Sequence, residues 1–258
     1  MTHKIQLLDR PDNEYRTQKD WIPIFNGRKE KMISVADTAD IAENNQEADL
    51  AKLHSDFKGI LMSSSQLEFN THDLGATITH DVGSEVVKPT KIVLKEVPVG
   101  RPIFLKELLE LELGLAYARA LTKKPKATKE QLTDTFVTLS GKKAEKIEFW
   151  TPTQSQRKDR PVRCVWLCFY DFGRFVVGAD GRADGIGGLS RGVIVPSAKQ
   201  TKPDRACVAV DCQEHNWRQY FKLEFGKGSS KPYLAPDGFY CTKCIKKKRD
   251  SDGRKTNS

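Results

Sequence analysis

The residues best suited to chemistry lie near the end of the chain, where four of the six cysteines fall within 38 residues. They form two closely spaced pairs, Cys207/Cys212 and Cys241/Cys244, and His215 follows the first pair. Thiolate and imidazole groups a few residues apart can turn onto one Zn²⁺ ion through a tight backbone turn. The sequence therefore predicts a tetrahedral zinc site whose ligands are four cysteines, or three cysteines and His215.

Two other roles are open to these cysteines. They can be ordinary buried thiols, which are common in intracellular cores, or a disulfide pair, which requires an oxidising compartment. The first residues contain no apolar signal-peptide segment, and no run approaches the ~18 apolar residues of a membrane-spanning helix. We therefore expect an intracellular protein without membrane contact, cytoplasmic or, in a eukaryotic host, nuclear.

Positive charge is concentrated in the part of the chain that holds the cysteines. Residues 1–100 carry 12 Lys/Arg and 16 Asp/Glu, whereas residues 101–258 carry 31 Lys/Arg and 18 Asp/Glu, a net of +13. Such asymmetry suggests a polyanionic partner, although a Lys-rich surface also serves solubility alone. The charge pattern therefore favours nucleic acid, DNA or RNA, as the partner.

The segment between the cysteine pairs mixes aromatic and cationic residues, and four consecutive cations follow the last cysteine. Clustered cations favour phosphate contacts, where released counterions drive binding, and interleaved aromatic rings suit the bases of single strands. The alternative interpretation of the end of the chain is a disordered, solubilising tail. The predicted nucleic-acid-binding residues are Arg218, Lys222, Lys243, Lys246, Lys247, Lys248 and Arg249.

Element patterns predict an α+β fold: a β-rich body with two central helices, followed by a small C-terminal zinc-binding module with a basic tail. Short β-branched runs between residues 60 and 94, broken by Ser, Gly and Pro, are typical of a meander of strands. The predicted divisions are a partly helical or flexible N-terminal extension (1–58), an α+β body (59–200), the Cys/His zinc module (203–248) and a disordered tail (249–258).

The first central helix is predicted over residues 104–121, where apolar residues cover more than one face. Such a helix is buried or faces a partner subunit, so it is our candidate for a homo-oligomer contact. The second starts at Thr128, which forms a capping box with Gln131, and ends at Gly141. Strands follow at 147–150 and 162–170. In the second of these, Cys164 and Cys168 share a face and are predicted to be core residues.

Histidine–aspartate pairs in the N-terminal half suggest an alternative, a metal-dependent nuclease or hydrolase. They are His54/Asp56, His72/Asp73 and His80/Asp81, and two of them repeat the triplet Thr-His-Asp. Their spacing matches no known metal signature, and no complete set of catalytic roles can be assigned. The favoured hypothesis is a non-enzymatic, zinc-stabilised nucleic-acid-binding protein. A protein-interaction or structural role for the zinc module remains a third possibility.

Overall fold

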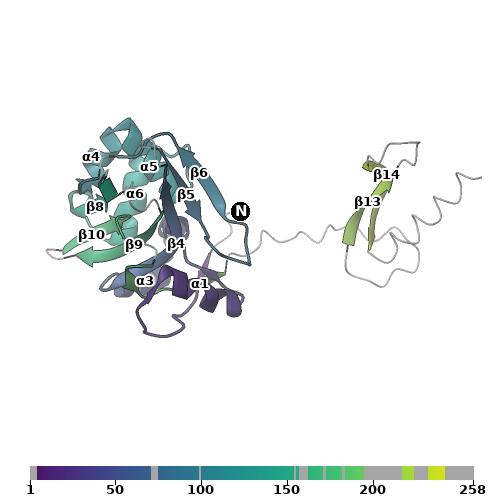
Figure 1. The fold of residues 1–258 in the computed structure, drawn as a ribbon, viewed down its shortest axis with the longest axis horizontal. Helices are drawn as coiled ribbons and strands as arrows, with labels where there is room; N and C mark the ends of the chain where they lie inside the picture. Colours follow the sequence, from purple (N-terminus) through teal and green to yellow (C-terminus); the bar gives the residue numbers. More distant parts are fainter. Residues whose placement is uncertain are drawn as a thin grey trace, which may run out of the picture. The chain divides into compact units, whose positions relative to one another are not determined.

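The structure is a computed structural model of the 258-residue chain, which divides into two compact units, Met1–Pro196 and Ser197–Ser258 (Figure 1). In the first unit the structure describes residues 5–70, 75–98, 100–153, 155–156, 162–170, 173–181 and 184–194. In the second it describes the backbone of two strands, β13 (Trp217–Leu223) and β14 (Pro232–Cys241).

A seven-stranded sheet, curved into half a barrel, organises the first unit. Its strand order is β6-β5-β4-β9-β10-β8-β7, and neighbours are antiparallel except for β8 and β10, which are parallel. The predicted β-rich α+β body and the meander of β4, β5 and β6 are confirmed. The strands are β4 (Ile60–Phe69), β5 (Ala76–His80), β6 (Thr90–Leu94), β7 (Ile103–Phe104), β8 (Ile147–Trp150), β9 (Val162–Tyr170) and β10 (Arg174–Gly178).

Two smaller sheets connect the beginning of the chain to residues 187–194. In the first, β12 (Gly192–Ile194) lies between β1 (Gln6–Leu7) and β3 (Lys31–Met32). In the second, β2 (Arg16–Thr17) pairs with β11 (Gly187–Gly188). The chain therefore returns to its N-terminal residues at the end of the first unit.

Six α-helices lie in the described residues, and most of their ends follow from local sequence. Ser34 and Asp37 form a capping box at the start of the second helix. The predicted box of Thr128 and Gln131 is confirmed, and the last helix ends at Gly141 with a left-handed φ of 62°. The helices are α1 (Gln18–Gly27), α2 (Val35–Glu43), α3 (Glu47–Asp56), α4 (Leu105–Glu110), α5 (Glu112–Thr122) and α6 (Lys129–Ser140).

The predicted helix over residues 104–121 is two helices, because the chain is extended at Leu111 (φ −86°, ψ 132°). Gly114 permits the break: a Cβ there would lie 2.0 Å from the carbonyl oxygen of Leu108. The chain changes direction between α4 and α5, which explains why apolar residues cover more than one face of the single helix that was predicted. Most of them enter the core, whereas Leu111 and Leu113 at the break are exposed.

Each face of the large sheet has its own apolar core. Alternation along β9 sends Val165 and Leu167 to the larger core, which the helices α2 to α6 cover. The opposite face carries Trp166, against which α1 places the buried rings of Trp21 and Phe25. Residues predicted as an N-terminal extension, those before residue 59, therefore supply three helices to the same compact unit.

Two glycines, the last residue of β10 and the last residue of β11, serve close packing. A Cβ on Gly178 would lie 2.1 Å from the indole ring of Trp166, and one on Gly188 would lie 2.4 Å from the carbonyl oxygen of Ile60. The indole nitrogen of buried Trp21 donates to the carbonyl oxygen of Gly188 at 2.8 Å. The missing side chains let this segment press against Trp166 and β4.

Replacing Gly178 with alanine is therefore expected to destabilise the protein. The added methyl group must displace a buried indole, and overpacking of this kind costs about 1–3 kcal/mol. The matched control is Gly187→Ala, because a Cβ on Gly187 meets its nearest atom at an ordinary 3.8 Å. Urea unfolding followed by near-ultraviolet circular dichroism measures both changes. Equal midpoints for the two variants would contradict the packing role of Gly178.

Candidate functional site

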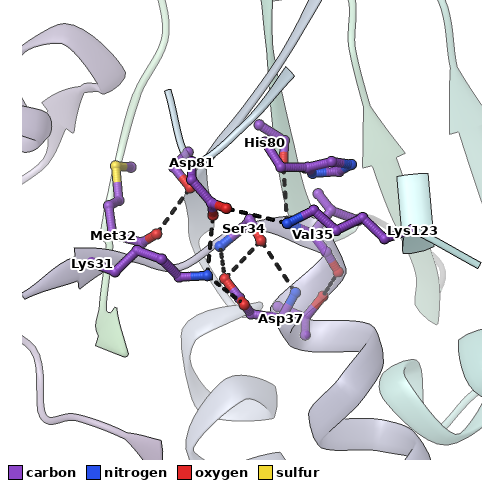
Figure 2. Close-up of polar contacts among 11 residues, drawn as sticks. Lys31, Met32, Ser34, Val35, Asp37, His80, Asp81 and Lys123 are labelled. Carbon is purple, nitrogen blue, oxygen red and sulfur yellow. Dashed lines mark hydrogen bonds and ion pairs between the residues drawn. The ribbon is translucent and has the colours of Figure 1, made fainter. Parts of the chain in front are cut away.

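A buried ionic network lies where α2 begins, and Figure 2 shows its members converging from separate elements. Lys31 Nζ lies 2.6 Å from Asp37 Oδ1 and 3.1 Å from Asp81 Oδ1. All three side chains are at most 5% exposed. Lys123, just after α5, approaches the other oxygen of Asp81 at 3.2 Å. The network therefore joins β3, α2 and the ends of β5 and α5.

Each oxygen of Asp37 has a defined partner. Oδ1 faces Lys31, whereas Oδ2 accepts from the backbone N–H of Ser34 at 2.7 Å and from its hydroxyl at 2.6 Å. Burial by itself would lower the pKa of Lys31, but the carboxylates of Asp37 and Asp81 outweigh it and raise that pKa. Lys31 is therefore a cation held in place by two anions, and it has no spare lone pair with which to act as a base.

Two residues of this network have left-handed backbone conformations. Asp81 has φ 61° and Lys123 has φ 57°. Lys123 ends α5, where a left-handed residue commonly closes a helix. Asp81 turns the chain out of β5, and aspartate is among the residues that tolerate this region of φ/ψ space. The ion pair between them therefore fastens two tight turns together.

His80 lies beside the ionic network and is fully buried. Its Nε2 lies 2.9 Å from the carbonyl oxygen of Ala120, and its Nδ1 lies 2.9 Å from the hydroxyl of Ser65. A carbonyl can only accept, so we assign the proton to Nε2, and Nδ1 then accepts from Ser65. The Ser65 hydroxyl in turn accepts from the backbone N–H of Val35 at 3.0 Å. Burial lowers the pKa of His80, in agreement with a neutral ring.

Three consecutive serines place these partners. β4 runs through Ser63, Ser64 and Ser65 as one strand, with a shift in its pairing to β9 between Met62 and Gln66. The Ser63 hydroxyl donates to the carbonyl oxygen of Val165 at 2.6 Å, and that of Ser64 donates to the carbonyl oxygen of Met32 at 2.9 Å. The three serines therefore stabilise the register shift, and β4 continues through it as one strand.

Buried Gln18 anchors α1 to the same irregularity. Its Nε2 donates to the carbonyl oxygens of Ser63 and Ser65, at 2.6 and 3.1 Å. Side-chain amides and hydroxyls thus satisfy backbone groups that a regular ladder would have paired. The hydroxyl groups of the three serines are thus engaged in hydrogen bonds within the fold.

The other described histidine–aspartate pair is also engaged within the fold. Asp56 is fully buried and receives Arg191, which donates through Nη2 to Asp56 Oδ1 at 3.2 Å and through Nε to the second oxygen. Arg191 also donates to the carbonyl oxygen of Leu8 at 3.1 Å. His54 Nε2 lies 2.9 Å from the carbonyl oxygen of Leu139. These contacts tie α3 to β12 and to the end of α6.

The two described histidine–aspartate pairs thus fill structural positions. Within the described ranges, no three His, Cys, Asp or Glu side chains gather as a metal site would require. His72 and Asp73, the third predicted pair, lie outside the described residues. Among the residues that can be placed, the network can orient helices and turns, and nothing in it is set up to activate a water molecule.

Cys164 and Cys168 are buried and unbridged, on the sheet face that also carries Trp166, which confirms their predicted place in the core. Burial raises the pKa of Cys164 to about 12 and that of Cys168 to about 11. Both sulfurs are therefore protonated thiols at neutral pH, and neither is a nucleophile or a ready metal ligand.

The C-terminal unit contains an antiparallel hairpin formed by β13 and β14. Its register pairs Trp217 with Cys241 at one end and Leu223 with Pro232 at the other. Of the predicted zinc ligands, Cys241 is the last residue of β14. The other predicted ligands, Cys207, Cys212, His215 and Cys244, lie outside the described residues.

Two of these ligands nevertheless lie within a few residues of a paired position of the hairpin. His215 precedes Trp217 by two positions, and Cys244 follows Cys241 by three. Each residue advances the chain by at most about 3.8 Å. In sequence, the predicted ligands His215 and Cys244 therefore adjoin the same end of the hairpin, where β13 begins and β14 ends.

The predicted nucleic-acid-binding residues divide in the same way. Arg218 and Lys222 lie in β13, where their register partners are Tyr240 and Tyr233. The remaining predicted contacts lie outside the described residues: Lys243, Lys246, Lys247, Lys248 and Arg249.

The comparisons with protein-family models, with curated proteins and with solved structures found no match to this chain. Among the helices of the described residues, none combines the length and the apolar character needed to cross a bilayer.

Lys31 and Gln18 were not singled out from the sequence, although both are buried, Lys31 at the centre of the ionic network and Gln18 against the serines of β4. One local signal was available, because Ser34 and Asp37 have the spacing of a capping box. That signal predicts a helix start. It does not predict that the aspartate also binds a lysine from the preceding strand.

Replacing Lys31 with methionine is expected to destabilise the protein by about 3–5 kcal/mol, because it leaves the buried carboxylate of Asp37 without a cation and Asp81 with Lys123 alone. Lys52→Met is the control, since Lys52 pairs with Asp9 on the surface at 3.1 Å, and such pairs contribute about 0–1 kcal/mol. Urea unfolding at pH 7.5 compares the two variants. A loss at Lys31 no larger than at Lys52 would show that the network is not needed for stability.

We expect buried, neutral His80 to make a contribution to folding stability that is lost at acidic pH. Its pKa in the folded protein lies below the ordinary 6.5, so the unfolded chain binds the proton more readily. Stability from this residue is therefore present above about pH 6.5 and declines as the pH falls, by at most about 1.4 kcal/mol per pH unit. Urea midpoints at pH 7.5 and 5.5 should differ less for His80→Gln than for the wild type. The same difference in both proteins would refute the assignment.

Proposed function

We propose that the chain is a non-enzymatic nucleic-acid-binding protein whose C-terminal unit is stabilised by one Zn²⁺ ion. The observation that carries the proposal is the register of the hairpin, which pairs Trp217 with Cys241. It supports a site at the open end, because both candidate ligand pairs adjoin that end in sequence. Zinc ligands with this separation converge readily through short turns.

The register favours one of the two predicted ligand sets. Cys212-x-x-His215 and Cys241-x-x-Cys244 have the same spacing, and each adjoins one strand of the hairpin. Cys207 stands ten positions before Trp217 and has no equivalent on the other strand. We therefore propose Cys212, His215, Cys241 and Cys244 as the ligands.

Metal binding has a clear physical role in a unit of this kind. An isolated two-stranded hairpin is at best marginally stable in water. Coordination at the open end would hold both strands together, and structural zinc supplies on the order of 10 kcal/mol to folding in small modules. The ion would act as a structural clamp, with all four positions filled by protein.

Charge supports the choice of partner. Residues 197–258, the second compact unit, carry 14 Lys/Arg and 7 Asp/Glu, a net of +7. The first unit holds 29 Lys/Arg and 27 Asp/Glu, a net of only +2. Most of the excess positive charge of the protein therefore belongs to the second unit. Nucleic-acid backbones attract such a surface through counterion release.

Elemental analysis combined with oligonucleotide binding tests both parts of the proposal. We expect one zinc per chain in the wild type and none in the Cys241→Ser/Cys244→Ser variant. Binding to a labelled single strand should weaken steeply between ~50 and ~200 mM salt, as phosphate contacts do. Replacing Lys246, Lys247, Lys248 and Arg249 with glutamine should weaken binding and flatten its salt dependence.

Two controls separate the outcomes. Cys164→Ser/Cys168→Ser changes the same number of thiols in the first unit and should leave the zinc content unchanged. Lys142→Gln/Lys143→Gln/Lys146→Gln removes three cations from the first unit and should alter binding little. Zinc absent from the wild-type protein would refute the metal site, and absent or salt-insensitive binding of the oligonucleotide would refute the phosphate contacts.

A further inference from the structure

The face of the large sheet that carries Trp166 is covered unevenly. α1 places Trp21 and Phe25 over Trp166 and Met62, within the smaller core. Toward β8 and β7, the same face bears partly or largely exposed aromatic side chains. Tyr170 is 44% exposed and Phe104 is 39% exposed, while Trp150 is partly buried.

Strand register explains why these rings share one surface. Tyr170 pairs with Arg174 across β9 and β10, and Phe104 pairs with Glu148 across β7 and β8. Alternation sends these four side chains to the face opposite the helices. Trp150 joins them from the end of β8. We call Phe104, Trp150, Tyr170 and Arg174 the aromatic ledge.

The ledge is held in shape by contacts within it. The Trp150 ring lies edge-on to those of Tyr170 and Trp166, with centroids 5.4 and 6.0 Å apart. Arg174 places its guanidinium carbon 5.7 Å from the centre of the Tyr170 ring. Its Nη1 lies 3.1 Å from Glu148 Oε2. The rings of Trp150 and Tyr170 are therefore pre-positioned, so a ligand that stacks on them meets a small entropic cost.

We propose that the aromatic ledge binds bases of a single-stranded nucleic acid. Bases stack on exposed tyrosine and phenylalanine rings irrespective of sequence, and a neighbouring arginine adds cation–π attraction. Tyr170 and Phe104 lie on strands separated by β10 and β8, which gives the surface room for more than one base. The inference rests on the proposed function, since it assigns that function a second contact, on the first unit.

Charge on this surface suits an anionic partner. Among the described residues of β7 to β10 on this face, Glu148 is the sole acid, and Arg174 already neutralises it. The connection that leaves β8 at Trp150 and enters β9 at Val162 has three cations and one acid in its sequence, Arg157, Lys158, Asp159 and Arg160. A strand whose bases rest on the rings would therefore meet no uncompensated carboxylate on the described ledge.

Fluorescence anisotropy with the full-length protein tests the proposal, using labelled 20-nucleotide dT and rU strands at ~50 mM salt. Tyr170→Ala and Phe104→Ala are each expected to weaken binding about 5- to 100-fold, the range for loss of one stacked base. Tyr170→Phe keeps the ring and should bind within twofold of the wild type. Tyr15→Ala removes a ring that is 57% exposed and belongs to none of the ledge strands, and it should also bind normally.

Photocrosslinking to rU, followed by mass spectrometry of peptides, provides an independent measurement. Adducts on the Tyr170 peptide and none on the Tyr15 peptide would support the ledge. Wild-type affinity in both alanine variants would overturn it, and if the basic-tail variant still lost binding, the proposed function would survive alone. Absence of oligonucleotide binding by the wild-type protein would refute both.

Discussion

The first unit depends on a lysine that is buried between two aspartates. Lys31 neutralises Asp37 at the start of α2 and Asp81 at the end of β5, so strands and helix must meet at one point. A charge buried without a partner is strongly unfavourable, and this requirement fixes where the helix begins relative to the sheet. Ser65 and His80 extend the same constraint toward α5. Alternative packings of α2 would expose these charges or leave them unpaired.

Local chemistry made much of this fold predictable. The box of Thr128 and Gln131 and the glycine after α6 are read directly from neighbouring residues. The meander of β4, β5 and β6 follows from period-two patterns and short connections. Lys31 and Asp81 stand 50 positions apart, and no local pattern relates them. The break at Leu111 was missed because apolar residues on several faces indicate burial, and they do not reveal that the helix changes direction.

The two proposed sites also differ in how far they could be predicted from local sequence. Spacing alone was sufficient to propose the zinc ligands, and the hairpin register then favoured His215 over Cys207 in that proposal. The ledge could not be proposed from the sequence, because Tyr170 lies on β9 while Phe104 and Trp150 lie on β7 and β8, and only β10 joins these strands into one surface. Together the proposals describe a basic, metal-clamped unit that attracts the phosphate backbone and a rigid sheet that receives bases.

The position of β10 also bears on how the polypeptide acquires its shape during synthesis. β8 precedes β9 in the sequence, yet β10 separates them in the sheet. The portion made of β4, β5, β6 and β9 therefore has no ladder contact with β7 and β8 until residues 174–178 have been translated. Parallel pairing of this kind must wait for distant segments to meet. Before then, a nascent chain presents two incomplete halves with open edges, the state in which chaperones have most to protect.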